Sequence, residues 1–205
     1  MTFFTALIII HPSTVNVKSK VEKLLLPYDS YIEVEPYKEY LDREELVEKI
    51  NELKTISEEE IHKIAKGWEV EANNLEVLAK FELDWFDELI DGVDENGEYK
   101  MTTLNPDGKW DWYKFVDMEG MTSRLFVPDI HTFPVKEIEF VPYAVVTPDG
   151  KWHELGEEAG LKAFVNKEIK GIEVMSEHGI NWREKVRQIK SDFPDYLAVI
   201  LHCHD

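Results

Sequence analysis

Cysteine is almost absent from this chain, which has a single one, Cys203, among 205 residues. No disulfide can therefore form within the chain, and because this usage is typical of a reducing compartment, we expect a cytoplasmic location. Long apolar runs are missing too, since no stretch reaches the roughly 18 apolar residues that a membrane-spanning helix needs. The apolar segment 1–10 has neither a basic flank nor a small-residue cleavage site. It predicts a buried strand rather than a signal peptide.

Basic residues are scarce as well. The chain has 23 Lys and Arg against 42 Asp and Glu, for a net charge of −19. Such a surface repels nucleic acid, so we expect no direct binding of DNA or RNA. The acidic excess has two interpretations: it keeps the protein soluble, or it imitates a phosphate backbone in front of a basic host protein. Disorder is not expected, because 43% of the residues are hydrophobic and 12% are aromatic.

Common catalytic signatures are also missing. The sequence has no glycine-rich phosphate loop, no Gly-x-Ser-x-Gly elbow, no Cys-x-x-Cys and no His-Glu-x-x-His. It therefore indicates no cofactor and favours a binding protein over an enzyme. The segment His202–Asp205 resembles a metal site, but its further ligands would have to come from His11, His131 or His153. We interpret it as a strand end with surface histidines and predict no metal.

What the sequence does contain is a near-repeat. The segment Asn105–Trp110 reads Asn-Pro-Asp-Gly-Lys-Trp, and Thr147–Trp152 reads Thr-Pro-Asp-Gly-Lys-Trp. Pro presets the backbone for the second position of a β-turn, Asp closes the turn, and Gly tolerates positive φ. Each copy therefore predicts a tight turn, after which the Lys-Trp pair begins a strand.

The middle of the chain is acidic and has helical patterning. Residues 39–98 hold 20 Asp and Glu against 6 Lys and Arg. Two capping boxes, Asp42 with Glu45 and Ser57 with Glu60, precede apolar residues at helical spacing. A third helix is predicted over 75–90. We therefore interpret 39–98 as an acidic helical insertion.

The flanking parts have the patterning of strands and amphipathic helices. Helices are predicted after Asn16 and Asn181, and strands at 4–10, 30–35, 139–146, 151–155 and 196–202. The order is β-α-β before the insertion and β-β-α-β after it. We predict an α+β fold in which an antiparallel, ferredoxin-like sheet has helices on one face, with 1–205 forming a single domain. An exposed edge strand would also permit a homo-oligomer.

Two tryptophan motifs give the chain a family resemblance. The strings NPxxKWDWY at Asn105–Tyr113 and FVPYAVVTPDGKWH at Phe140–His153 resemble a family of uncharacterised proteins encoded by bacteriophages and prophages. The resemblance covers about half of the chain and implies a phage-type accessory protein without an established activity. This chain departs from the family pattern after the first motif, because a Gly-Gly-Arg-aromatic group is replaced by Lys114–Gly120 and the nearest arginine is Arg124.

The same motifs supply the candidate binding residues. If the segment around Asp111 is a strand, Trp110 and Trp112 lie on one face and Tyr113 on the other. The rings then either fill the core or form a wall on which a nucleobase stacks, with a cation beside its phosphate. The predicted ligand-binding set is Lys109, Trp110, Trp112, Tyr113, Arg124, Trp152 and His153.

Three functions follow from these observations. The leading hypothesis is a phage-type accessory protein that acts by binding, in counter-defence, by sequestering a small nucleotide signal. The second is an acidic inhibitor whose segment 39–98 docks on a basic host protein in place of nucleic acid. The third is a histidine-dependent metal hydrolase.

Overall fold

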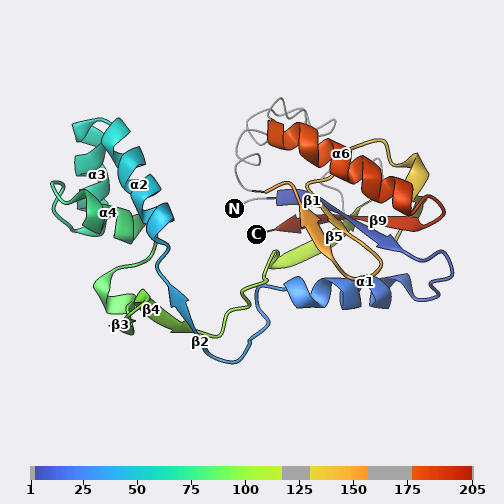
Figure 1. Cartoon of the computed structure of the whole chain (residues 1–205), viewed down its shortest axis with the longest axis horizontal. Coiled ribbons are helices and arrows are strands. Elements are labelled where there is room, and N and C mark those ends of the chain that lie inside the picture. Colours follow the sequence, from blue (N-terminus) through green and yellow to red (C-terminus); the bar gives the residue numbers. More distant parts are fainter. Residues whose placement is uncertain (1–2, 117–129, 157–176, 205) are drawn as a thin grey trace. The chain divides into compact units, whose positions relative to one another are not determined.

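The computed structural model describes residues 3–116, 130–156 and 177–204. The chain divides into two compact units, Met1–Ile32 with Leu104–Asp205, and Glu33–Thr103 (Figure 1). The second unit contains the whole of the predicted insertion 39–98. No helix in the described ranges has the length and apolar character needed to cross a membrane.

The first unit is built on a sheet with the strand order β5-β9-β1-β7-β8, and β6 also pairs with β9. Strand β1 pairs antiparallel with β9 along its whole length and parallel with β7. The other described pairings of this sheet are antiparallel. The predicted α+β class with a mostly antiparallel sheet is therefore confirmed. The strands are β1 (Phe3–Ile10), β5 (Trp112–Val116), β6 (Phe133–Pro134), β7 (Ala144–Val146), β8 (Trp152–Glu154) and β9 (Leu197–His204).

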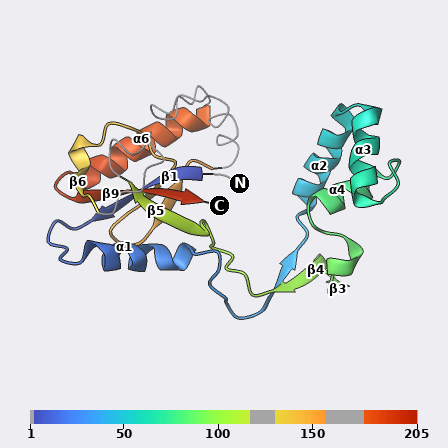
Figure 2. The ribbon, with the colours of Figure 1, turned by 180° about the vertical axis from the view of Figure 1, so that it is seen from behind.

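Helices cover both faces of this sheet (Figures 1 and 2). Helix α1 (Val17–Leu25) packs on one face, and helix α6 (Glu177–Asp192) packs on the other. The prediction of helices on one face is thus corrected. The reason lies in β1, whose uninterrupted apolar run offers alternate residues to both sides, such as Ile8 to α1 and Leu7 to α6. The ferredoxin-like arrangement remains a prediction.

The second unit combines three helices with a small antiparallel sheet of order β2-β4-β3. The helices pack around a small buried cluster. Both predicted capping boxes mark true helix starts, since Asp42 accepts hydrogen bonds from two backbone amides and Ser57 forms a reciprocal pair with Glu60. The elements are β2 (Tyr37–Tyr40), α2 (Arg43–Thr55), α3 (Glu58–Trp68), α4 (Leu75–Glu82), β3 (Gly92–Asp94) and β4 (Gly97–Thr102).

The segment 39–98 is less helical than predicted. Helix α4 ends at Glu82 rather than near residue 90, because Asp84 adopts a positive φ of 55°. The chain then forms the hairpin of β3 and β4, in which Gly97 has a φ of 128°. Single 3-10 turns occur at Leu26–Tyr28, Asp87–Leu89 and Val135–Glu137.

Two predicted strands are also corrected. Segment 30–35 is not a strand, because Asp29 turns the chain by accepting a hydrogen bond from the amide of Tyr31, and β2 begins later. The strand predicted over 139–146 is limited to Ala144–Val146. Pro142 stands just before it and has no amide hydrogen for a sheet.

Candidate functional site

Both near-repeat segments form the predicted tight turns. The amide of Gly108 donates to the carbonyl of Asn105 at 2.9 Å, and the amide of Gly150 donates to that of Thr147 at 2.8 Å. Gly150 has a φ of 88°, which glycine adopts without strain. At Gly108 the reason is space, since a Cβ there would lie 2.9 Å from the Cα of Ser30.

Tyr28 holds the two turns together. Its carbonyl accepts a hydrogen bond from the amide of Lys109 at 2.8 Å. Its hydroxyl donates to the carbonyl of Gly150 at 2.7 Å and accepts from the amide of Trp152 at 3.0 Å. The repeated sequence therefore has a structural role in the first unit, because the backbone of each copy forms hydrogen bonds with the same tyrosine.

The lysine of the first copy is already paired. The Nζ of Lys109 lies 2.8 Å from Oε1 of Glu154, and the indole Nε1 of Trp152 donates to Oε2 of the same carboxylate at 2.8 Å. Trp152 also packs against the ring of Tyr28, with 5.1 Å between the ring centroids. The ammonium group of Lys109 and the indole N–H of Trp152 are therefore both bound to the carboxylate of Glu154.

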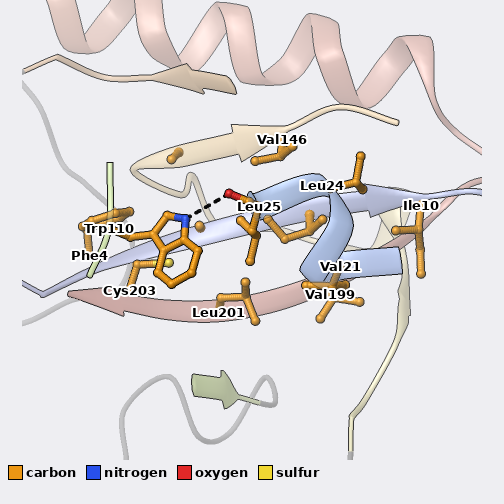
Figure 3. Close-up of a cluster of buried hydrophobic side chains, with 13 residues drawn as sticks. Phe4, Ile10, Val21, Leu24, Leu25, Trp110, Val146, Val199, Leu201 and Cys203 are labelled. Atoms are coloured by element: carbon orange, nitrogen blue, oxygen red, sulfur yellow. Dashed lines mark hydrogen bonds between the residues drawn. The ribbon is translucent and has the colours of Figure 1, made fainter. Parts of the chain in front are cut away.

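Trp110 is a core residue. It is 8% exposed, and its Nε1 donates a hydrogen bond of 3.3 Å to the carbonyl of Leu25 at the end of α1 (Figure 3). The indole lies in the same apolar cluster as Phe4 and Cys203. Because β5 begins only at Trp112, the alternation of a strand does not extend back to Trp110.

The prediction that Trp110 and Trp112 share a face is therefore wrong. Trp110 lies edge-on to Tyr113, with 5.1 Å between centroids, on the side of the sheet that α1 covers. Trp112 alternates with Tyr113 in β5 and points to the other side. Burial raises the pKa of Tyr113 to about 12, with a smaller contribution from the charge of Glu22.

The two predicted binding residues of the second motif, Trp152 and His153, are divided in the same way. Trp152 packs on the α1 side, whereas the next residue, His153, pairs with Val145 of the cluster on the α6 side. Burial lowers the pKa of His153, and the nearby charge of Lys185 on α6 lowers it further. Arg124 lies outside the described residues. Trp110, Tyr113 and Trp152 thus lie on the α1 side of the sheet, whereas Trp112 and His153 lie on the other side.

Trp112 belongs to a different aromatic cluster at the edge of the sheet. Strand register places Trp112, His204 and Phe3 side by side on β5, β9 and β1. The indole stacks on the imidazole with 5.3 Å between centroids and 14° between planes, and Phe3 meets both rings edge-on. Trp112 is 43% exposed and Phe3 is 45% exposed. This cluster therefore presents aromatic surface to solvent.

A carboxylate holds the histidine of this cluster. Nδ1 of His204 lies 2.7 Å and 2.8 Å from the two carboxylate oxygens of Asp111. The backbone repeats the pairing, because the amide of Asp111 donates to the carbonyl of His204 at 2.9 Å. His204 is 8% exposed, so the interpretation of the C-terminal histidines as surface residues is wrong for His204. Both segments, the tryptophan motif that contains Asp111 and the C-terminal histidines, attract attention in the sequence, but for separate reasons.

The next row of the same face carries a lysine and a second histidine. Lys114 of β5 stands opposite His202 of β9 in the register. Burial lowers the pKa of His202, and the charge of Lys114 lowers it further. Within the described ranges, no group of three or more His, Cys, Asp or Glu side chains could hold a metal ion.

Comparisons with known proteins leave the chain without an assigned family. No family model matches it, and no curated protein or solved structure is similar enough to count as a match. The phage-family resemblance therefore stays a prediction, and function must be argued from the site alone.

Proposed function

We propose that the protein binds a small nucleotide-like molecule at the edge of the main sheet. Its ring would stack on Trp112 and Phe3, and its phosphate would lie beside Lys114 and His202. Together with the resemblance to phage-encoded proteins, this suggests an accessory protein that sequesters a nucleotide signal in counter-defence. Catalysis is not part of this proposal.

One observation carries the proposal: an exposed indole adjoins a lysine, Lys114, and a titratable histidine, His202, on the same sheet face. Trp112 is 43% exposed, although it is one of the largest apolar side chains. Aromatic side chains of this kind bind bases by stacking, which tolerates any base because each has a π-face. In a chain with a net charge of −19, the Lys114–His202 pair is a local site that suits an anion.

Calorimetry with three probes tests the proposal. We expect AMP, ADP-ribose or cyclic di-AMP to bind the full-length protein at concentrations of tens of micromolar. For ADP-ribose, whose diphosphate charge is constant near neutral pH, the affinity should rise as the pH falls from about 8 to about 6. The direction of this pH dependence follows from His202. The pKa of His202 is lowered in the free protein, and a bound phosphate favours the protonated ring, so binding is tighter where the ring is more easily protonated.

The matched control is His202→Asn, which should bind ADP-ribose with little dependence on pH. No heat with any of the three probes rules out the proposal. If the affinity of the wild-type protein is independent of pH, the proposed stacking on Trp112 stands, but His202 does not contact the phosphate.

The acidic second unit favours a second candidate function, docking on a basic protein. Residues 33–103 hold 22 Asp and Glu against 8 Lys and Arg, so most of the net charge lies in this one compact unit. Opposite charges speed association, and salt screens them. We expect the protein to retain a basic partner from a bacterial lysate at low salt and to release it at about 0.5 M salt.

Charge reversal at Glu48, Glu71 and Glu88 should weaken this retention. All three side chains are exposed, and none lies in the first turn of an α-helix, where a carboxylate stabilises the helix itself. Retention that survives both high salt and the triple variant would contradict the docking function.

A further inference from the structure

One ring nitrogen of the aromatic cluster lacks a hydrogen-bond partner in the part of the chain that the structure describes. Asp111 accepts a hydrogen bond from Nδ1 of His204 through both carboxylate oxygens, at 2.7 Å and 2.8 Å. This contact places a proton on Nδ1, because an ionised carboxylate can only accept. In the neutral ring, Nε2 is then a hydrogen-bond acceptor. Nε2 is buried, and it finds no hydrogen-bond partner among the described residues.

A buried acceptor without a partner needs an explanation. Nε2 has lost its hydrogen bonds to water, and residues 3–116, 130–156 and 177–204 supply none in exchange. This loss costs free energy, and in most proteins such groups are satisfied. A histidine held at Nδ1 by a carboxylate has its ring orientation and tautomer fixed. This arrangement orients Nε2 for use by another molecule.

The two rings that contact His204 reach the surface of the protein. Phe3 and Trp112 both contact the imidazole, and both are close to half exposed. His202 lies two residues along the same strand, about 7 Å away on the same face. A single nucleotide spans a similar separation between its ribose hydroxyls and its phosphate.

We propose that Nε2 of His204 accepts a hydrogen bond from a ribose hydroxyl of the bound ligand. The inference rests on the proposed function and narrows it: the site selects ribonucleotides over analogues without ribose hydroxyls. His204 is the recognition residue, and Asp111 is a positioning residue that keeps the proton on Nδ1. Trp112 provides the stacking surface, and His202 with Lys114 meets the phosphate.

Two matched pairs of ligands test the inference by calorimetry. The pairs are AMP with 2′,3′-dideoxy-AMP, and cyclic di-AMP with its 2′-deoxy counterpart. We expect the wild-type protein to prefer the hydroxyl-bearing member by about 10-fold, because the analogue leaves Nε2 unpaired. His204→Asn keeps a nitrogen near the Nδ1 position for Asp111 but lacks Nε2. This variant should bind both members of a pair about equally.

Two controls separate recognition from damage to the fold. His204→Gln keeps a polar atom near the Nε2 position and should retain part of the preference, although it also lacks the ring. His11→Asn changes a histidine outside the site. The ring of His11 contacts Ser13, and this variant should bind the ligands like the wild type. A preference that is undiminished in His204→Asn would overturn the inference.

The remaining outcomes are distinguishable from one another. Equal wild-type affinity for both members of a pair removes the inference and leaves the proposed function intact. Absence of binding by every nucleotide removes both. Nitrogen-15 spectra of the ligand-free protein provide an independent check: the neutral ring of His204 should carry its proton on Nδ1, and a proton on Nε2 instead would overturn the inference.

Discussion

Replacing Trp110 with alanine is expected to lower the free energy of unfolding by about 3–5 kcal/mol, the usual cost of removing a large buried aromatic side chain. The indole is 8% exposed and lies among Phe4, Leu25 and Cys203. Its loss would leave a cavity between α1 and the sheet, and the carbonyl of Leu25 would lose its hydrogen bond from Nε1. Urea unfolding followed by circular dichroism measures the change.

Trp110→Phe is the matched variant. It keeps most of the apolar volume and loses the indole N–H, so the loss of stability should be clearly smaller than for alanine. A loss below about 1 kcal/mol for Trp110→Ala would contradict the assignment of Trp110 to the core, because losses of that size are typical of exposed positions.

The two tryptophans of the first motif thus have different roles, although they are two residues apart. Trp110 lies between a tight turn and the start of the strand, and its indole packs in the core beneath α1. Trp112 is the first residue of β5 and faces the opposite side. The two copies of the near-repeat have a structural role, because shared residues hold them in place. Tyr28 forms hydrogen bonds with both turns, and Glu154 pairs with Lys109 of the first copy and Trp152 of the second.

Local signals in the sequence predicted the local structure well. The capping boxes at Asp42 and Ser57, the turns ending at Gly108 and Gly150, and the apolar strand Phe3–Ile10 are all present. The caps and the turns depend on residues that are neighbours in the chain, and their defining hydrogen bonds reach no further than one turn. The strand is recognised from its own apolar run, although its pairing partners are distant in the sequence. The same reasoning failed at Asp84 and at Pro142, where single residues end a regular pattern.

Long-range register could not be predicted in the same way. Asp111 and His204 are separated by 93 positions, and they meet because β5 pairs with β9 in one particular register. A shift of one residue would turn His204 to the other face of the sheet. Both segments, the Trp-Asp-Trp group and the C-terminal histidines, stand out in the sequence. No sequence signal predicts that they are in contact. The aromatic site therefore emerges only from the fold.

Replacing Trp112 with alanine is expected to reduce ligand affinity more than stability, unlike the Trp110 substitution. Stability should fall by only about 1 kcal/mol, because the indole is 43% exposed and its removal opens no enclosed cavity. Affinity for ADP-ribose should fall about 10-fold to 100-fold, because stacking on an aromatic side chain contributes about 1–3 kcal/mol per base. Calorimetric titration and urea unfolding of the same sample measure both quantities.

Trp112→Phe completes the comparison, since it should keep an intermediate affinity through its smaller ring. In the Trp110→Phe variant, by contrast, affinity should stay close to that of the wild type, because Trp110 lies on the face covered by α1 and its polar group is used by Leu25. If Trp112→Ala binds ADP-ribose as tightly as the wild type does, the exposed aromatic cluster is not the binding site. If Trp112→Ala instead unfolds as readily as Trp110→Ala, its main role is packing against His204 and Phe3.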